Sequence, residues 1–527
     1  MSSNRSFRSV FGAFILAAVA TVPAVAAAAP GGRGCAERNN NQYHKLLECV
    51  TVDGVREHQA AFQAIADANG GTRADQTPGY DASVDYVADT MTAAGWTVEV
   101  VPFEYPGTDV VLQQLTPTSS DYVSATFTGG GEGDVTGTVV PVDLSLADPA
   151  TSSSGCEAAD FAGVDLSGPA DVALIQRGTC NFSFKALNAE AAGAEAVIIF
   201  NQGTADRLGP YSNVTLGGPD VVDLPVVTAS FDAGVALAAP GSVARVKVES
   251  VTRVSHNVIA EKAGKTSGNV VMAGAHLDSV PAGPGINDNG SGSAVLLEVA
   301  DNLGNHTPQN TLRFAWWGAE ELGLIGSTAW VGQRSQEQLD EIALYLNFDM
   351  VGSPNHVFMV YDADESTFPA PVPVPDGSIA IEDTFESYYT WAGVPYDDTA
   401  FSGRSDYQAF INNGIPSSGL FTGAEVIKTP EQAAIWGGVA GEQFDPCYHL
   451  ACDTFDNVNL GALDVNADAV AFAVLTYAYS TESVNGVPGK KVPGNFSIPA
   501  PAGEEGTFGA PGGGGLDHDH DHEASDG

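Results

Sequence analysis

Basic residues are scarce in this chain of 527 residues: 21 Lys and Arg stand against 65 Asp and Glu, a formal net charge of −44. A surface with this charge repels nucleic-acid phosphates and anionic lipid headgroups. We therefore expect neither nucleic acid nor a membrane as a partner. The hydrophobic content of 44% is that of an ordinary globular protein, which excludes a mostly disordered or fibrous chain.

Long apolar runs are lacking after the N-terminus, and we expect no later segment to span a membrane. Residues 1–29 contain Arg5 and Arg8, an apolar run from Val10 to Val22, and small residues from Ala24 to Ala29. This is the pattern of a secretory signal peptide. The alternative is a membrane anchor, which needs ~20 apolar residues, more than this run provides. The sequence therefore predicts a secreted, extracellular protein.

Cysteine is limited to six residues, and no two of them form a CxxC pair. An even number in an exported protein favours disulfide bonds. Proximity in the sequence favours three pairs, although other connectivities are formally allowed: Cys35–Cys49, Cys156–Cys180 and Cys447–Cys452. A zinc site built from cysteines is the alternative, and the missing CxxC spacing argues against it.

The pattern of helices and strands predicts an α/β fold. Single hydrophobic cores stop growing near ~250–300 residues, so we expect two domains. Helical periodicity is found at 53–69, 80–94 and 291–303, and strand patterns at 96–101, 269–275, 311–317 and 344–348. Alternation of this kind is typical of a mostly parallel sheet flanked by helices.

The stretch from 122 to 249 has a different composition, with short apolar runs among Gly, Thr, Val and Ser and one helical pattern at 184–194. Because the N-terminal helices need the later sheet as a partner, we expect this mostly-β module to be inserted into one α/β domain. The expected segments are 1–29 (signal peptide), 30–121 and 251–486 (α/β domain), 122–250 (inserted module) and 487–527 (tail). The tail is rich in Gly and Pro and ends in alternating Asp with His518, His520 and His522, so we expect disorder, with either weak metal scavenging or a solubilising role.

Histidine is also rare, with seven residues outside the tail, so their positions are informative. His276 and Asp278 follow a predicted strand, and ligands of open α/β sheets bind beyond the carboxyl ends of strands. Asp288 lies in a glycine-rich turn before a predicted helix. Further candidates follow later strands or lie between two cysteines: Glu320, Glu321, Asp349 and His449.

Each of these residues has an ordinary explanation alone, as a core histidine, helix cap, turn former or surface acid. Together, two imidazoles and several carboxylates suit one or two zinc ions. A carboxylate on a flexible turn can bridge two metals ~3.5–4 Å apart, as in two-metal hydrolases.

These motifs resemble those of the secreted bacterial double-zinc aminopeptidases, of which vacuolar aminopeptidase Y and glutamate carboxypeptidase are more distant members. The matching strings are GAHLDSV (274–280), GINDNGSG (285–292), WWGAEELG (316–323), NFDM (347–350), GRSD (403–406), GLFTGA (419–424), CYH (447–449) and CD (452–453). The stretch 171–201 resembles a protease-associated (PA) domain, which in that family is a non-catalytic insertion near the mouth of the active site. Its role is open between substrate gating, partner binding and stability.

The resemblance implies a zinc exopeptidase that acts on peptides with a free N-terminus. The implied metal ligands are His276 and Asp349 on one zinc, Glu321 and His449 on the other, and Asp288 between them. The implied catalytic residues are Glu320 as general base, Tyr448 as donor to the oxyanion, and Asp278, which hydrogen-bonds His276 and fixes its ring. The implied substrate-binding residues are Asp349, the backbone near Arg404, and Met350 and Phe421 in an apolar pocket for large residues such as leucine.

Asp464 and Asp468 lie four residues apart on one predicted helix face, where related secreted enzymes bind calcium. Two solvated acids are the alternative. The main prediction is a secreted, monomeric, zinc-dependent aminopeptidase with two zinc ions. The alternatives are a carboxypeptidase or dipeptidase on the same fold, a single-zinc acyltransferase resembling glutaminyl cyclase, and a non-catalytic binding protein.

Overall fold

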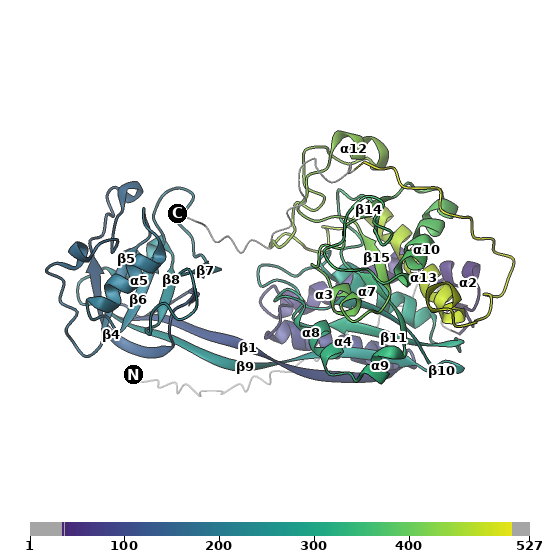
Figure 1. Cartoon of the computed structure of the whole chain (residues 1–527), viewed down its shortest axis with the longest axis horizontal. Helices are drawn as coiled ribbons and strands as arrows, with labels where there is room; N and C mark the ends of the chain where they lie inside the picture. The colour runs from purple at the N-terminus through teal and green to yellow at the C-terminus, as the bar shows by residue number, and fades with distance from the viewer. Residues whose placement is uncertain (1–33, 36, 508–527) are drawn as a thin grey trace, which may run out of the picture.

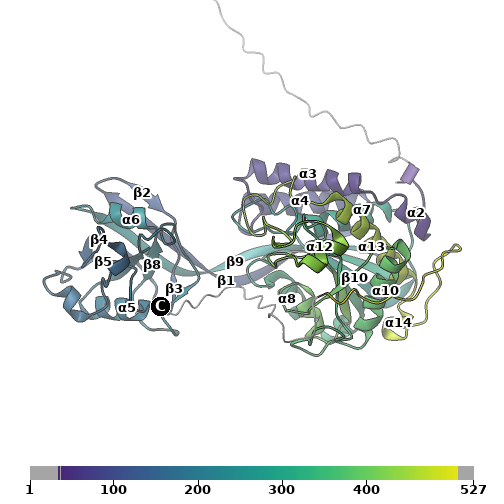
Figure 2. The same ribbon diagram turned by 90° about the horizontal axis from the view of Figure 1, so that it is seen from above.

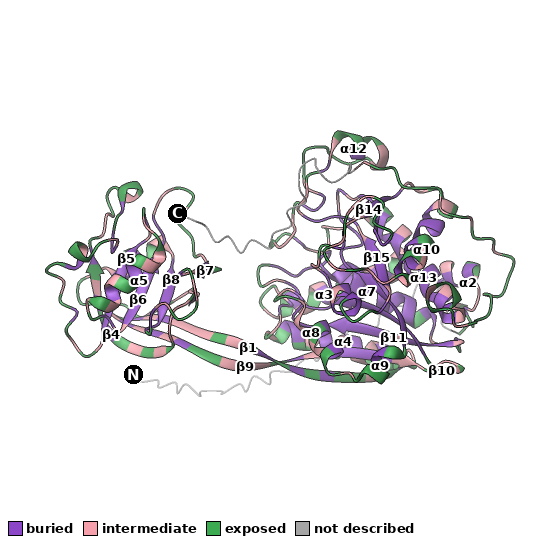
Figure 3. Ribbon diagram, viewed as in Figure 1, coloured by how far each residue is buried: buried purple, intermediate pink, exposed green. Residues whose placement is uncertain are grey.

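The computed structural model describes residues 34–35 and 37–507 and shows two lobes joined by a long ribbon of strands (Figure 1). The predicted signal peptide at 1–29 and the His-Asp end of the tail lie outside the described residues. Purple strands in the middle of both lobes in Figure 3 mark a separate buried core in each.

The larger lobe is built on a mostly parallel sheet. Its centre contains β11 (Asn310–Trp317), β10 (Thr266–His276), β12 (Ile342–Phe348) and β15 (Ser417–Phe421), which are parallel and adjacent in that order. Beyond β15 lie β13 (Met359–Tyr361), antiparallel to it, and β14 (Asp397–Thr399). Beyond β11 lies the antiparallel β9 (Val243–Lys262). The carboxyl ends of the four central strands therefore share one edge.

Helices cover both faces of this sheet (Figure 2). One face is packed by α2 (Tyr43–Leu47), α3 (Val52–Ala68), α4 (Pro78–Ala93), α7 (Gly290–Asn302), α10 (Gly377–Ala392) and α13 (Leu460–Tyr479). The other is packed by α8 (Ile325–Gly332), α9 (Gln336–Asp340) and α11 (Tyr407–Ile411). Alternate side chains of β10 pack into the hydrophobic cores on opposite faces of the sheet. Val271 and Ala273 pack against the first group of helices, and Met272 packs against the second. The predicted parallel sheet flanked by helices is confirmed.

The helices begin where the sequence supplies caps. The Thr51 side chain accepts the backbone N–H of Gly54 at the start of α3, and that of Thr77 accepts Tyr80 N–H at the start of α4. These two helices lie within two residues of their predicted positions. The short α12 (Pro430–Trp436) and α14 (Glu482–Asn485) complete the lobe.

The smaller lobe is centred on parallel strands β4 (Gly133–Val142), β5 (Asp171–Gln176), β6 (Ala196–Phe200) and β8 (Val226–Ala229), adjacent in that order. The helices α5 (Phe182–Ala191) and α6 (Phe231–Leu237) flank them. A two-stranded sheet of β3 (Phe127–Thr128) and β7 (Val214–Thr215) lies beside it. The predicted helix and the strand that follows it are thus present.

Two long antiparallel strands, β1 (Thr97–Thr116) and β9, run through both lobes. The sequence pattern predicted only the first part of β1, at 96–101. At ~3.3 Å per residue a strand of 20 residues reaches roughly 65 Å. This length lets β9 pair with β11 in the larger lobe and with β4 in the smaller one, so that the strands of both lobes form one 13-stranded sheet. The expected segment boundary at residue 250 lies inside β9. The short β2 (Ser120–Tyr122) pairs with β1 at the far end.

Two stretches near the C-terminus differ from expectation. The helix α13 is long and apolar enough to cross a membrane by length and composition, but 67% of its most apolar window is buried inside the fold. Residues 487–507 form no helix or strand, yet they are not a detached tail. The Phe496 ring packs 4.7 Å from that of Tyr43, and the Gly506 backbone N–H donates to Asp397 at 3.1 Å. These contacts hold the segment against the larger lobe.

The three predicted disulfide pairs are confirmed. They are Cys35–Cys49 at an S–S distance of 2.07 Å, Cys156–Cys180 at 2.08 Å and Cys447–Cys452 at 2.11 Å. The last closes a loop of the larger lobe next to the strand ends.

Candidate active site

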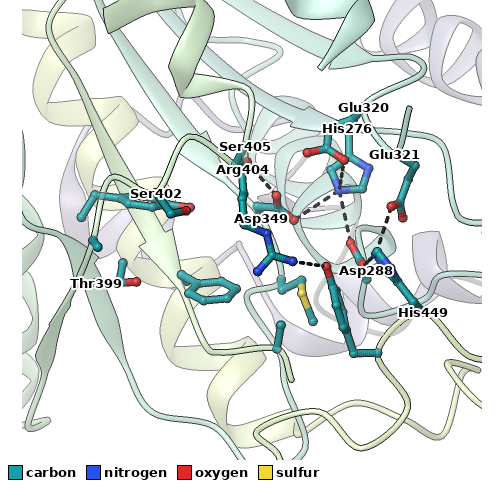
Figure 4. Close-up of a pocket in the computed structure, with 16 residues that line it drawn as sticks. His276, Asp288, Glu320, Glu321, Asp349, Thr399, Ser402, Arg404, Ser405 and His449 are labelled. Atoms are coloured by element: carbon teal, nitrogen blue, oxygen red, sulfur yellow. Dashed lines mark hydrogen bonds and ion pairs between the residues drawn. The ribbon is translucent and has the colours of Figure 1, made fainter. Parts of the chain in front are cut away.

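The five side chains predicted as metal ligands meet at the carboxyl edge of the larger sheet (Figure 4). His276 Nε2 lies 3.2 Å from Asp288 Oδ1 and 3.3 Å from Asp349 Oδ1. His449 Nε2 lies 3.2 Å from Asp288 Oδ2 and 3.0 Å from Glu321 Oε2. Asp288 therefore presents one oxygen to each imidazole, which is the arrangement expected of a carboxylate shared by two ions.

The loop that carries Asp288 is fixed by Asp453. The Asp453 carboxylate accepts the backbone N–H of Asn287 at 2.8 Å and that of Asp288 at 3.0 Å. On the other side of the loop, Asn289 caps α7 by accepting Gly292 N–H at 2.9 Å and donates to the backbone oxygen of Phe348 at 2.9 Å. Asp288 is thus positioned from both sides, and its side chain remains directed at the two histidines.

Asp278 makes contacts that the sequence did not predict. Its carboxylate lies 3.7 Å from His276 Nδ1, and the nearer partner of that nitrogen is the Asp278 backbone oxygen at 3.1 Å. The two carboxylate oxygens instead accept the backbone N–H groups of Glu320 at 3.2 Å and Glu321 at 3.3 Å. The Asp278 carboxylate therefore fixes the turn after β11 that carries Glu320 and Glu321. The carboxylate also lies within ion-pair distance of the His276 ring, and the predicted side-chain hydrogen bond between them stays a prediction.

Asp349 is oriented by a residue that sequence reasoning did not assign. Its Oδ2 accepts the hydroxyl of Ser405 at 2.6 Å, and the Ser405 oxygen accepts the Asn347 side-chain amide at 2.8 Å. Ser405 and Asp453 both lie in strings that matched the family motifs, but an isolated serine or aspartate carries no signal of such a positioning role.

The second histidine comes from the loop closed by Cys447 and Cys452. The ring of Tyr448 stacks on that of His449 with centroids 3.8 Å apart. The Tyr448 hydroxyl oxygen accepts Arg404 Nη2–H at 2.9 Å, and Arg404 Nη1–H donates to Glu425 at 2.8 Å. The resemblance had implied only the backbone near Arg404; the structure places its guanidinium in the pocket, beside Tyr448.

The cluster contains more buried acidic groups than basic ones. Burial raises the pKa of Glu320, and repulsion from Asp349 adds to it, while His276 opposes the shift. Burial likewise raises the pKa of Glu321 to about 7. Burial alone would lower the pKa of His449, but contacts with Asp288 and Glu321 raise it to about 10. Two imidazoles are thus surrounded by four acids.

The donor set fits zinc. The ligand atoms of His276, Asp288 and Glu321 lie within 4.8 Å of one another, and so do those of His276, Glu320 and Asp349. The buried Oε1 of Glu321 has no hydrogen-bond partner, a costly state for a carboxylate unless a cation binds it. Imidazole nitrogen and carboxylate oxygen are the ligands that zinc accepts in catalytic sites.

A pocket opens beside these ligands. Met350 and Phe421 line it, as predicted, together with Tyr361, Ala424 and Thr399. The sequence assigned no pocket role to the last three, because they lie on short strands or loops and carry no distinctive chemistry. No residue of the smaller lobe's described part lines this pocket, so the expected position of the PA domain at its mouth is not seen here.

Asp464 and Asp468 lie on α13, away from this cluster. Asp464 is exposed and Asp468 is half-buried. Within residues 34–35 and 37–507, no group of three or more potential ligands that could hold a metal includes either of them. Calcium at these two residues remains a prediction.

Comparisons with known proteins agree with this geometry. Residues 257–474 match the family described as peptidase family M28, and residues 135–237 match the PA domain. The chain is 47% identical over 451 residues to an aminopeptidase of Pseudomonas aeruginosa, covering 84% of this chain and 83% of that protein. It is 42% identical over 352 residues to leucine aminopeptidase 2 of Trichophyton rubrum, covering 66% of this chain and 68% of that protein.

Among solved structures, the zinc aminopeptidase BSAP of Bacillus subtilis is 27% identical to this chain, with a TM-score of 0.56, covering 80% of this chain and 94% of that one. The similarity extends over most of both chains, in sequence and in fold. The chain therefore belongs to peptidase family M28, as a metallo-aminopeptidase with an inserted PA domain.

Proposed function

We propose that this protein is a secreted aminopeptidase that uses two zinc ions to remove large hydrophobic residues from the N-terminus of peptides. The observation that carries the proposal is the position of Asp288 between the two histidines, 3.2 Å from each. His276 and Asp349 would hold one ion, Glu321 and His449 the other, and Asp288 both. Zinc bound there would lower the pKa of water and polarise the peptide carbonyl.

Glu320 is proposed as the general base. Its Oε2 lies 3.8 Å from His276 Nε2, at the edge of the ligand cluster, and its side chain is buried. Its carboxylate takes the proton of the attacking water and passes it to the nitrogen of the leaving peptide. A pKa raised by burial suits a group that must first accept and then return a proton near neutral pH.

Tyr448 is proposed as the donor to the oxyanion. Because its oxygen already accepts an N–H from Arg404, its own hydroxyl proton can be donated to the carbonyl oxygen as negative charge develops there. Stacking on His449 and the Cys447–Cys452 bridge hold the ring beside the metal ligands.

We attribute recognition of a free N-terminus to the excess of acidic side chains over basic ones in the site. A substrate ammonium placed near Glu320 and Asp349 would gain two anionic partners in a buried setting. The adjoining wall of Met350, Tyr361 and Phe421 is apolar and would accept a large aliphatic side chain. The relative named leucine aminopeptidase 2 supports this preference.

Export is supported by the disulfides. Three bridges among the described residues leave no free cysteine there, and such bonds persist in oxidising compartments. The proposal therefore retains the predicted signal peptide at 1–29.

The preference for a free amino group is tested with matched substrates. We expect leucine p-nitroanilide to be hydrolysed and its N-acetyl derivative to be resistant, because acetylation removes the ammonium that the acids would bind. Leucine should also be preferred over aspartate at the same position. The Glu320→Gln variant, purified in parallel, controls for a contaminating peptidase. Cleavage of N-blocked, C-terminally free peptides at a comparable rate would instead identify a carboxypeptidase.

A further inference from the structure

A second cluster of acids lies at the β14 edge of the larger sheet, apart from the predicted zinc ligands. It is built from three neighbouring elements: the loop after β13, the helix α10 and the strand β14. Its members are Asp362, Asp364, Glu382, Glu386 and Asp398. Nothing in the aminopeptidase chemistry proposed above uses these side chains.

The acids form two groups of three, each of them close enough to hold a cation. The ligand oxygens of Asp362, Asp364 and Glu382 lie within 4.8 Å of one another, and those of Glu382, Glu386 and Asp398 do the same. Glu382 belongs to both groups. It lies four residues before Glu386 on α10, so both side chains leave the same face of that helix.

Three of these acids are buried with an oxygen that has no hydrogen-bond partner. Glu382 is 3% exposed, Glu386 4% and Asp398 0%. The unpartnered atoms are Glu382 Oε1, Glu386 Oε1 and Asp398 Oδ1. Burying a carboxylate oxygen without a partner is costly, and burying three side by side is more so, unless a cation compensates them.

The described part of the chain supplies no such cation in an ion pair. The stretch 335–403 contains neither Lys nor Arg. Across the described part of the chain, the ion pairs include none of the five acids. The C-terminal segment adds another acid, because the charge of Glu504 also acts on Glu386 and Asp398.

Protonation is the competing explanation. Burial and repulsion among the acids raise the pKa of Glu382 to about 10 and that of Glu386 to about 8. Without a cation these two groups would therefore be neutral at pH 7. The two explanations predict different responses to added metal. A metal site is stabilised when the ion binds, whereas acids that are already protonated are not.

The chemistry of the donors selects the ion. Every donor is an oxygen, and no imidazole or thiolate takes part, which suits a hard cation and not zinc. Calcium takes 6–8 oxygen ligands in flexible geometry, and carboxylates from several elements can supply them. We propose that Glu382, Glu386 and Asp398 bind a calcium ion, with Asp362 and Asp364 supplying further oxygens from the adjoining loop.

Calcium at this site would stabilise one wall of the substrate pocket. Asp362 directly follows Tyr361, and Asp398 directly precedes Thr399; both of these neighbours line the pocket. The adjacent Asp397 also accepts the Gly506 N–H, so the same edge anchors the C-terminal segment. Calcium bound here therefore links folding stability to the shape of the pocket without touching the predicted zinc ligands.

The test uses the full-length, zinc-loaded enzyme freed of calcium in resin-treated buffer that contains zinc. Adding calcium chloride should raise the thermal midpoint saturably, by roughly 2–5 °C at concentrations well above the dissociation constant, because the ion binds only the folded state. KM for leucine p-nitroanilide should fall while the zinc content stays constant. The Glu382→Gln variant should lose both responses and still bind zinc.

The matched control is the double variant Asp464→Asn, Asp468→Asn, which removes the other candidate calcium ligands and should respond to calcium as the unmodified protein does. The proposal is overturned if calcium leaves the thermal midpoint of the unmodified protein unchanged, or if Glu382→Gln keeps the calcium response. A higher midpoint of Glu382→Gln at pH 7, together with no response of the unmodified protein to calcium, would establish protonation in its place.

Discussion

Replacing Glu320 with Gln is expected to lower kcat by about 10²–10⁴-fold while zinc remains bound. The amide has nearly the same shape as the carboxylate but cannot accept the proton of the attacking water. The predicted zinc ligands, His276 and Asp349 among them, are untouched by the change. Steady-state kinetics with leucine p-nitroanilide, together with elemental analysis of the same preparation, measures both quantities.

Glu337→Gln is the matched control, since Glu337 is exposed on α9 and belongs to no ligand group in the described part of the chain. It should have the turnover of the unmodified enzyme. Near-normal kcat in Glu320→Gln would remove Glu320 from the mechanism. A large loss accompanied by loss of zinc would make Glu320 a ligand, as its closeness to His276 and Asp349 allows.

Replacing Asp288 with Asn is expected to weaken zinc binding at both positions together. Its two oxygens face different histidines, so a single change removes an anionic ligand from each side. Loss of a residue that only supports a ligand typically costs 10–100-fold in metal affinity or activity, and a shared ligand should exceed about 100-fold. Zinc content after dialysis and kcat/KM measure the effect.

Asp453→Asn provides a graded comparison. Asp453 is not a predicted zinc ligand: its carboxylate accepts the backbone N–H groups of Asn287 and Asp288 and the side-chain amide of Asn457. Its replacement should therefore give the smaller loss of about 10–100-fold. Full zinc content and activity in Asp288→Asn would show that this carboxylate does not bridge two ions. Equal losses in the two variants would indicate that loop position, and not the Asp288 charge, is what the site requires.

Much of the site was predictable because its residues interrupt strong local patterns. His276 is the last residue of one apolar strand and Asp349 directly follows another, where a polar side chain has no packing role. Parallel strands place such ends at one edge, so separate strand ends in the sequence come together in space. The family motifs then supplied the individual roles.

What could not be predicted depends on contacts between distant segments. Pro102, Pro106 and Gly107 lie within β1 and would ordinarily end a strand, yet pairing with β9 carries β1 through them. The hydrogen bonds from the Glu320 and Glu321 amides to Asp278 could not be predicted, because they depend on the register between β10 and β11. The second acid cluster went unnoticed because its members come from three elements and share no motif.

The most direct test of the account is a zinc titration of the chelator-treated, full-length protein, with activity and bound metal measured on the same samples. The account predicts that the metal-free protein is inactive and that full activity returns as two zinc ions bind per chain. Full activity in a protein shown by elemental analysis to be metal-free, or with a single ion per chain, would contradict it.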